Sequence, residues 1–289
     1  MKIFNKVLVV AIAVLLLAVA ITFGRVRSVG AATTTIDLGT AAPFAILSGT
    51  PNITDSPTSA IKGNVGLYPG PGSGIGLLCS QVDGTIYERD NTGPLCFVDN
   101  DPLLNQAKQD LTDAFIDAVG RTGSATIVPT ELGGTTKTAG VYASNSTTFG
   151  ITAGQGPLVL DGQGDSSSVF IFEMNADGTG LTVGSGSTVS LINSAQACNV
   201  FWRVNTAAIN TTAVFKGNIL ALTSITVADS ANIEGRLLAR NGNVTLINDI
   251  IDVPICEVPP SPPTPPTPPT PAPGSNNLGP NLGLPYTGK

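Results

Sequence analysis

Short segments in which apolar residues alternate with Thr, Ala, Ser and Asn fill the C-terminal half of the chain. Read in sixes from Phe201, the sequence runs FWRVNT, AAINTT, AVFKGN, then ILALTS, ITVADS, ANIEGR, then LLARNG, NVTLIN, DIIDVP. Three sixes make a repeat of about 18 residues, the signature of a β-solenoid in which each turn adds one short strand to each of three stacked sheets. The pattern predicts a mainly β, three-faced β-solenoid domain over residues 33–256.

The first face of this solenoid is apolar at nearly every position. Its strands are expected at 170–174, 200–204, 218–222 and 236–240. A continuously apolar strand is covered on both sides, and we predict that a helix at about 102–119 supplies the cover. Pro102 and Gly120 suit the two helix ends. The apolar stripe of this helix, with spacings of three and four, consists of Leu104, Ala107, Leu111, Ala114, Phe115 and Ala118.

The N-terminal segment is expected to form a rung of the same solenoid. Residues 59–66, SAIKGNVG, closely echo residues 212–219, TAVFKGNI. Residues 67–100 show no usable periodicity, and we predict that they cap one end of the solenoid, since an open end exposes unpaired strands. A substrate-binding loop is the functional alternative for this segment.

The second face carries the functional prediction. Its strands lie within 147–154, 180–185, 207–212, 225–230 and 243–248. Alternation turns their apolar residues inward. The outward residues are then Thr148, Gly150, Thr152, Thr182, Gly184, Ala208, Asn210, Thr226, Ala228, Asn243 and Thr245.

These outward residues are short and uncharged, and Asp229 at a strand end is the one acidic residue near them. Stacked strands lie about 4.8 Å apart and alternate residues about 6.7 Å apart, so the side chains form a regular lattice. Threonine is stiff at χ1, which fixes its methyl and hydroxyl groups. Such a lattice can hold water in an ice-like arrangement and dock onto a growing crystal. The alternative is that threonine is frequent on this face only because it favours β-strands.

Six segments occur in a fixed order across residues 35–255. They are DLGTAAPFAILSG (37–49), AGVYAS (139–144), VFIFEM (169–174), QACNVFWRV (196–204), FKGNILALTSITV (215–227) and GRLLARNGNVTL (235–246). In this order they resemble the large family of secreted microbial ice-binding proteins. The resemblance implies a discontinuous right-handed β-solenoid with a flanking helix, a capping subdomain, and an ice-binding surface on the second face.

Departures from a regular threonine lattice limit this inference. Ala208, Asn210 and Asn243 interrupt the threonines, and Asp229 lies near the edge. They suggest moderate ice activity and leave open a carbohydrate ligand or an adhesin function on the same face.

Composition argues against an enzyme, a cofactor or a metal site. The chain has no His, so an acyltransferase of the solenoid type lacks its usual general base. The acidic residues of the strands and turns are spread over different faces, whereas a lyase or a Ca²⁺ site needs several converging carboxylates. The formal net charge of −6 also disfavours nucleic-acid binding. We expect a monomer.

The four cysteines are Cys79, Cys96, Cys198 and Cys256. An even count in an exported chain indicates two disulfides, although four cysteines allow three connectivities. The preferred pairing is Cys79–Cys96, local to the cap, and Cys198–Cys256, which ties down the last strands. Free buried thiols are the alternative.

The two ends of the chain are predicted to be targeting and attachment segments. Residues 1–31 contain basic residues, an apolar run and small residues, as in a signal peptide; an uncleaved membrane anchor is the alternative. Residues 257–289 form a Pro-rich linker. It ends in a motif that resembles a sortase signal, made of Leu284, Pro285, Tyr286, Thr287 and Gly288.

Only Lys289 follows this motif, whereas a sorting signal continues with an apolar helix and a basic tail. Either the chain is truncated at the sortase site or the match is accidental, and we favour truncation. The predicted location is therefore secreted or on the cell surface. The predicted partners are an ice crystal and, through a sortase, the cell wall.

Overall fold

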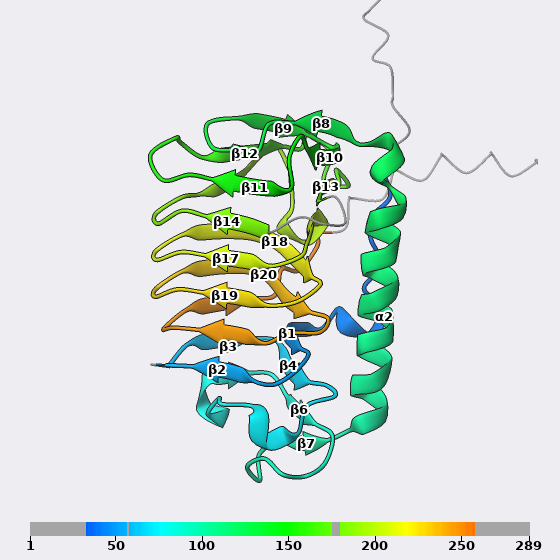
Figure 1. The fold of residues 1–289 in the computed structure, drawn as a ribbon, viewed down its shortest axis with the longest axis vertical. Helices are drawn as coiled ribbons and strands as arrows, with labels where there is room; N and C mark the ends of the chain where they lie inside the picture. The colour runs from blue at the N-terminus through cyan, green and yellow to red at the C-terminus, as the bar shows by residue number, and fades with distance from the viewer. Residues whose placement is uncertain (1–32, 57, 175–179, 258–289) are drawn as a thin grey trace, which may run out of the picture. The chain divides into compact units, whose positions relative to one another are not determined.

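The structure is a computed structural model that describes residues 33–56, 58–174 and 180–257. Its parallel strands form sheets of thirteen, six and three strands, stacked along one axis beside a long helix (Figure 1). The predicted three-faced β-solenoid is confirmed. The expected signal segment (1–31) and residues 258–289, with the LPYTG motif, lie outside the described residues. No helix within the described part is long and apolar enough to cross a membrane.

The first face is formed by ten strands of the largest sheet. In spatial order they are β7 (Val98–Asp99), β6 (Ile86–Glu88), β4 (Asn64–Leu67), β1 (Phe44–Ser48), β20 (Asn232–Ala239), β18 (Val214–Ala221), β16 (Val200–Val204), β13 (Phe170–Glu173), β10 (Gly140–Ser144) and β8 (Thr126–Val128). The first strand of the described residues, β1, thus pairs with β20, the last described strand of this face in sequence, through Ile46 beside Leu237 and Leu47 beside Leu238. The solenoid is therefore discontinuous, as the family resemblance implied.

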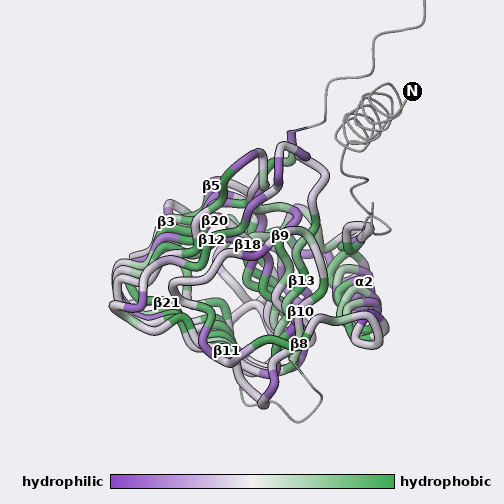
Figure 2. Tube along the Cα trace, turned by 90° about the horizontal axis from the view of Figure 1, so that it is seen from above, coloured by the Kyte–Doolittle hydropathy of each residue, from purple (hydrophilic) through white to green (hydrophobic). Residues whose placement is uncertain are grey.

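Helix α2 (Asp101–Gly120) makes this order possible, because it carries the chain from β7 at one end of the stack to β8 at the other (Figure 1). The side chain of Asn100 caps the helix by accepting a hydrogen bond from the Leu103 N–H at 3.1 Å. All six residues of the predicted stripe are buried. They share a core cluster with apolar side chains of the first face, among them Ile171, Phe201, Leu220 and Leu238. The helix lies outside the first face when the solenoid is viewed along its axis (Figure 2).

Truncation of the helix stripe is expected to be costly. Leu111 is completely buried, and Leu111→Ala should lower the free energy of unfolding by about 2–5 kcal/mol, because it leaves a cavity under the helix. Ile116 lies on the same helix but is 58 % exposed, so Ile116→Ala should change stability by at most about 0.5 kcal/mol. Urea unfolding followed by circular dichroism compares the two variants. If both variants lost the same free energy of unfolding, the helix would not cover the first face through its Leu111 side.

The second face is the six-stranded sheet. Its strands are, in spatial order, β11 (Thr148–Ile151), β14 (Gly180–Val183), β17 (Ala207–Ile209), β19 (Ile225–Val227), β21 (Val244–Leu246) and β2 (Ile53–Asp55). The third face comprises β9 (Thr136–Thr138), β12 (Leu158–Asp161), β15 (Val189–Ile192), the first halves of β18 and β20, then β22 (Ile250–Asp252), β3 (Ala60–Lys62) and β5 (Val82–Asp83). Strands β18 and β20 run round the corner from the third face to the first. Gly217, with φ +115°, makes the bend in β18.

Residues 67–100 lie at one end of the solenoid, as predicted for a cap. The sequence analysis did not predict any strands in this segment, but the three short strands β5, β6 and β7 continue the sheets there. Alternation fails as a signal here because two or three residues are too few to show a period. The predicted disulfides are both present: Cys79–Cys96 lies in the cap, and Cys198–Cys256 ties the C-terminal segment to the solenoid.

Candidate functional site

The second face is a flat ladder of short parallel strands (Figure 1). The apolar side chains of these strands are buried in the interior. The inward residues are at most 1 % exposed: Phe149, Ile151, Leu181, Val183, Ile209, Ile225, Val227, Val244 and Leu246. The eleven predicted outward residues are all exposed or half-buried. Strand alternation therefore places the side chains correctly, and the packed interior holds the outward lattice rigid.

A central column of outward residues runs across all six strands. Strand pairing aligns Gly150 with Thr182, Thr182 with Ala208, Ala208 with Thr226, and Thr226 with Thr245. Thr245 is next to Thr54 of β2. The column is therefore Gly150, Thr182, Ala208, Thr226, Thr245 and Thr54, at intervals of about 4.8 Å.

Two further columns flank the central one. One column lies just after the C-terminal ends of the strands. There the backbone N–H groups of Gly184, Asn210 and Ala228 each donate a hydrogen bond to the preceding rung, which places these residues in line with Thr152. Before the strands, Thr148 pairs with Gly180, and Ser224 donates a hydrogen bond from Oγ to Asn243 Oδ1 at 2.9 Å. All eleven predicted residues thus belong to one continuous surface.

The hydroxyl groups of this surface differ in what they bind. Among the described residues, no hydrogen bond joins the hydroxyl of Thr182 or Thr226 to another protein group, so both remain available to water. Thr245 Oγ1 accepts hydrogen bonds from Thr54 Oγ1 at 3.2 Å and from Asn243 Nδ2 at 3.0 Å. The Thr152 hydroxyl donates to the carboxylate of Glu131.

Glu131 terminates the second face at the β11 end, where it bridges to Gly150. Its carboxylate accepts hydrogen bonds from the backbone N–H groups of Thr152 at 3.1 Å and Gly133 at 2.6 Å. Partial burial raises the pKa of Glu131, but these hydrogen bonds and the one from the Thr152 hydroxyl outweigh it, and the pKa is lowered overall. The lattice therefore ends in a fixed negative charge on this side, a feature that the sequence did not indicate.

The sequence interpretation missed several residues of the surface, among them Thr54, Thr206 and Ser224. Thr54 lies in the N-terminal rung, and the echo of 59–66 in 212–219 was the signal that could have placed it. Thr206 and Ser224 occupy the column of Asn243, one residue before their strands, as the hydrogen bonds between neighbouring rungs show. The alternation that selected Asn243 also applies to them.

Asp249 lies buried where the second face turns into the third. Its Oδ1 accepts a hydrogen bond from the Ala231 N–H and its Oδ2 one from the Ile247 N–H, both at 2.9 Å. Burial raises the pKa of Asp249 to about 6; the two N–H groups oppose the rise, and the carboxylates of Asp55 and Asp229 add to it. This corner is therefore the acid-titrating part of the rim.

The raised pKa of Asp249 predicts a pH dependence of stability. The folded protein binds this proton more tightly than the unfolded chain, whose value is 3.8, so ionisation costs stability as the pH rises from about 4 to about 6. Relative to Asp249→Asn, the wild-type free energy of unfolding should fall by about 1–3 kcal/mol through this window. Urea unfolding of both proteins at a series of pH values measures the difference. If the free energies of unfolding of the two proteins change in parallel with pH, Asp249 does not have the raised pKa.

The fold and the site define a helix-flanked β-solenoid whose second face is a flat, uncharged strand surface. The family model described as Ice-binding-like matches residues 46–252, and the chain belongs to this family. An ice-binding protein of Flavobacterium frigoris is 37 % identical over 227 residues, which is 76 % of each chain. Ice-binding protein 1 of Shewanella frigidimarina is 35 % identical and matches 73 % of this chain but 25 % of its own length.

Solved structures agree with this assignment. A domain of the Shewanella frigidimarina ice-binding protein superimposes with a TM-score of 0.69 at 30 % identity and covers 78 % of this chain and 99 % of its own. An ice-binding protein from an Antarctic biological consortium superimposes with a TM-score of 0.66 at 33 % identity and covers 78 % of this chain and 94 % of its own. These relatives are named as ice-binding proteins, which supports the expectation that this chain is not an enzyme.

Proposed function

We propose that this protein binds ice through its second face. The central column supports the proposal most directly, because Thr54, Thr182, Thr226 and Thr245 occupy equivalent positions on parallel strands. Thr226, Thr245 and Thr54 follow one another at the strand spacing of about 4.8 Å, Thr182 lies two spacings from Thr226, and β-branching restricts the rotation of all four side chains. The eleven predicted residues act together with Thr54, Thr206 and Ser224 as the adsorbing surface.

The charge distribution fits this role. A charged group holds water in its own geometry and would interrupt an ice-like layer. Glu131 lies at the β11 end of the surface, and Asp229 lies at the corner beyond Ala228, where its Oδ1 accepts a hydrogen bond from Asn248 Nδ2 at 3.2 Å. Both acidic groups are therefore at the rim, and the three columns themselves are uncharged.

Thermal hysteresis and ice-crystal shape test the proposal. Adsorbed molecules force the crystal front to curve between them, which lowers its freezing temperature below its melting temperature. The full chain should therefore open a gap between the two temperatures and produce faceted crystals, and it should slow recrystallisation. Round crystals without a gap, from a protein that is folded by circular dichroism, would exclude the function.

The site of action is proposed to be outside the cytoplasm. Two disulfides fit an oxidising compartment, and residues 1–31 have the composition of an export signal. Attachment to a cell wall through Leu284–Gly288 is supported by the sequence motif alone. Fractionation of the producing cells, followed by sortase treatment of the purified chain, distinguishes a released from an attached protein.

The alternative of a carbohydrate-binding adhesin gains no support from the fold or from the relatives described above, all of which are named as ice-binding proteins. We therefore retain ice as the proposed ligand.

A further inference from the structure

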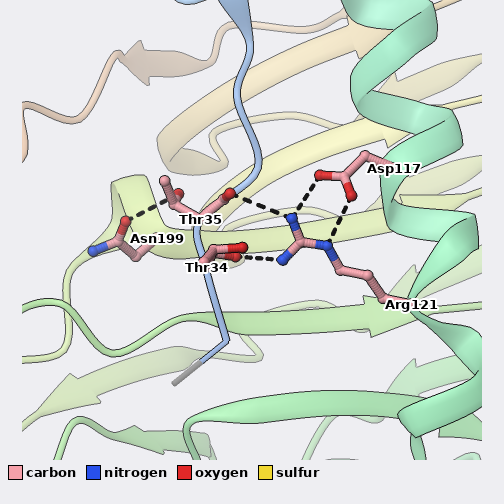
Figure 3. Close-up of polar contacts among 5 residues, drawn as sticks. All are labelled: Thr34, Thr35, Asp117, Arg121 and Asn199. Atoms are coloured by element: carbon pink, nitrogen blue, oxygen red, sulfur yellow. Dashed lines mark hydrogen bonds and ion pairs between the residues drawn. The ribbon is translucent and has the colours of Figure 1, made fainter. Parts of the chain in front are cut away.

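Both ends of the described domain lie at one corner of the solenoid, around the short helix η5 (Ala197–Asn199). At the N-terminal end, the Thr35 hydroxyl donates a hydrogen bond to Asn199 Oδ1 at 3.3 Å (Figure 3). The carbonyl oxygens of Thr34 and Thr35 accept hydrogen bonds from Arg121, which an ion pair with Asp117 holds in place (Figure 3). The N-terminal segment is thus fastened to the helix and to η5.

The C-terminal end is fastened to the same corner. Cys256 is bonded to Cys198 of η5. The side-chain amide of Gln196 donates to the carbonyl of Glu257 at 3.0 Å and accepts from its N–H at 2.6 Å. Glu257 is the last described residue at this end, so the described C-terminal segment ends beside η5.

This corner does not border the second face. Helix η5 connects β15 of the third face to β16 of the first, whereas the second face meets its neighbours at the other two corners. The described residues at both ends of the domain therefore lie away from the proposed ice-binding surface.

The disulfide decides where tension on the C-terminal segment enters the fold. Without it, only the two hydrogen bonds between Gln196 and Glu257 would precede β22. Strand β22 has three residues and joins β20 to β3, so it links the last rung to the first. With it, tension enters at Cys198, directly before β16. All five residues of β16 are buried, and the strand pairs on both sides, with β13 and β18.

We propose that the η5 corner is the attachment side of the domain, where force enters the fold, and that the Cys198–Cys256 disulfide is the clamp that prevents tension on the C-terminal segment from peeling off β22. The attachment role rests on the proposed ice-binding function. The clamp is a mechanical property that is measurable without ice, so failure of one is distinguishable from failure of the other.

Single-molecule force measurement tests the clamp. The full chain is held through its C-terminus and through a cysteine introduced by Thr226→Cys, which stands for the point held by ice. In the oxidised wild-type background we expect no early lengthening. With Cys198→Ala and Cys256→Ala together, we expect a low-force step of roughly 2–3 nm, the length of residues 250–256 at about 3.4 Å per residue.

The paired variant Cys79→Ala and Cys96→Ala is the matched control, because it removes the disulfide in the cap and should show no early step. If the Cys198/Cys256 variant does not fold, the oxidised wild type is folded first and then reduced in the instrument, with the same expected step. An early step in the oxidised wild type, or no early step after loss of the Cys198–Cys256 bond, would overturn the clamp.

Discussion

Thr226→Tyr is expected to abolish most of the thermal hysteresis while leaving the fold intact. Thr226 lies in the middle of the central column, is exposed, and has outward neighbours Ala208 and Thr245 on the adjacent strands. A tyrosine ring there stands above the surrounding short side chains and holds the surface away from a flat crystal plane. The core side chains Ile225 and Val227 point the other way, so stability should change by at most about 0.5 kcal/mol.

Asn232→Tyr is the matched control for this variant. Asn232 is exposed on β20 where that strand belongs to the third face, so the same bulky ring is placed on a strand that the proposal does not use. The control should retain wild-type hysteresis and crystal shape. If Thr226→Tyr keeps full activity, or if both variants lose it equally, then ice does not bind to the second face.

Trp202→Ala is expected to cause the largest loss of stability, about 3–5 kcal/mol. The indole is completely buried and stacks on Phe172 with ring centroids 4.1 Å apart and planes inclined by 11°. It also contacts Phe215 at 5.4 Å and donates a hydrogen bond from Nε1 to the Lys216 carbonyl at 3.2 Å. Removing it empties the centre of an aromatic stack that joins successive rungs.

Urea unfolding followed by circular dichroism measures this loss, because the variant has no tryptophan left for fluorescence. Trp202→Phe is the control. It keeps a ring against Phe172 but loses the bond to Lys216, and should cost about 1–2 kcal/mol. An alanine variant as stable as the phenylalanine variant would show that the stack does not stabilise the solenoid.

Sequence periodicity was sufficient where the local environment repeats. The second-face strands after residue 200 each bury one side against the same interior, so their alternation is regular and identifies Ile225 and Val227 as inward and Thr226 as outward. The helix stripe through Leu111 was equally clear, because a helix on one apolar face buries a residue every three or four positions. The same reasoning failed in 67–100, where strands such as Val98–Asp99 are too short to repeat a pattern.

By itself, the sequence determined the three-faced solenoid, the covering helix and the outward set around Thr226, since each follows from short-range spacing. It favoured one cysteine pairing without excluding the others. Tertiary structure alone decided that β1 follows β20, that Thr54 completes the central column, and that Glu131 ends it. The physical reason is that alternation fixes which side of a strand a residue faces. It does not fix which distant strand fills the next place in the stack, because parallel backbone pairing is available to any strand of matching register.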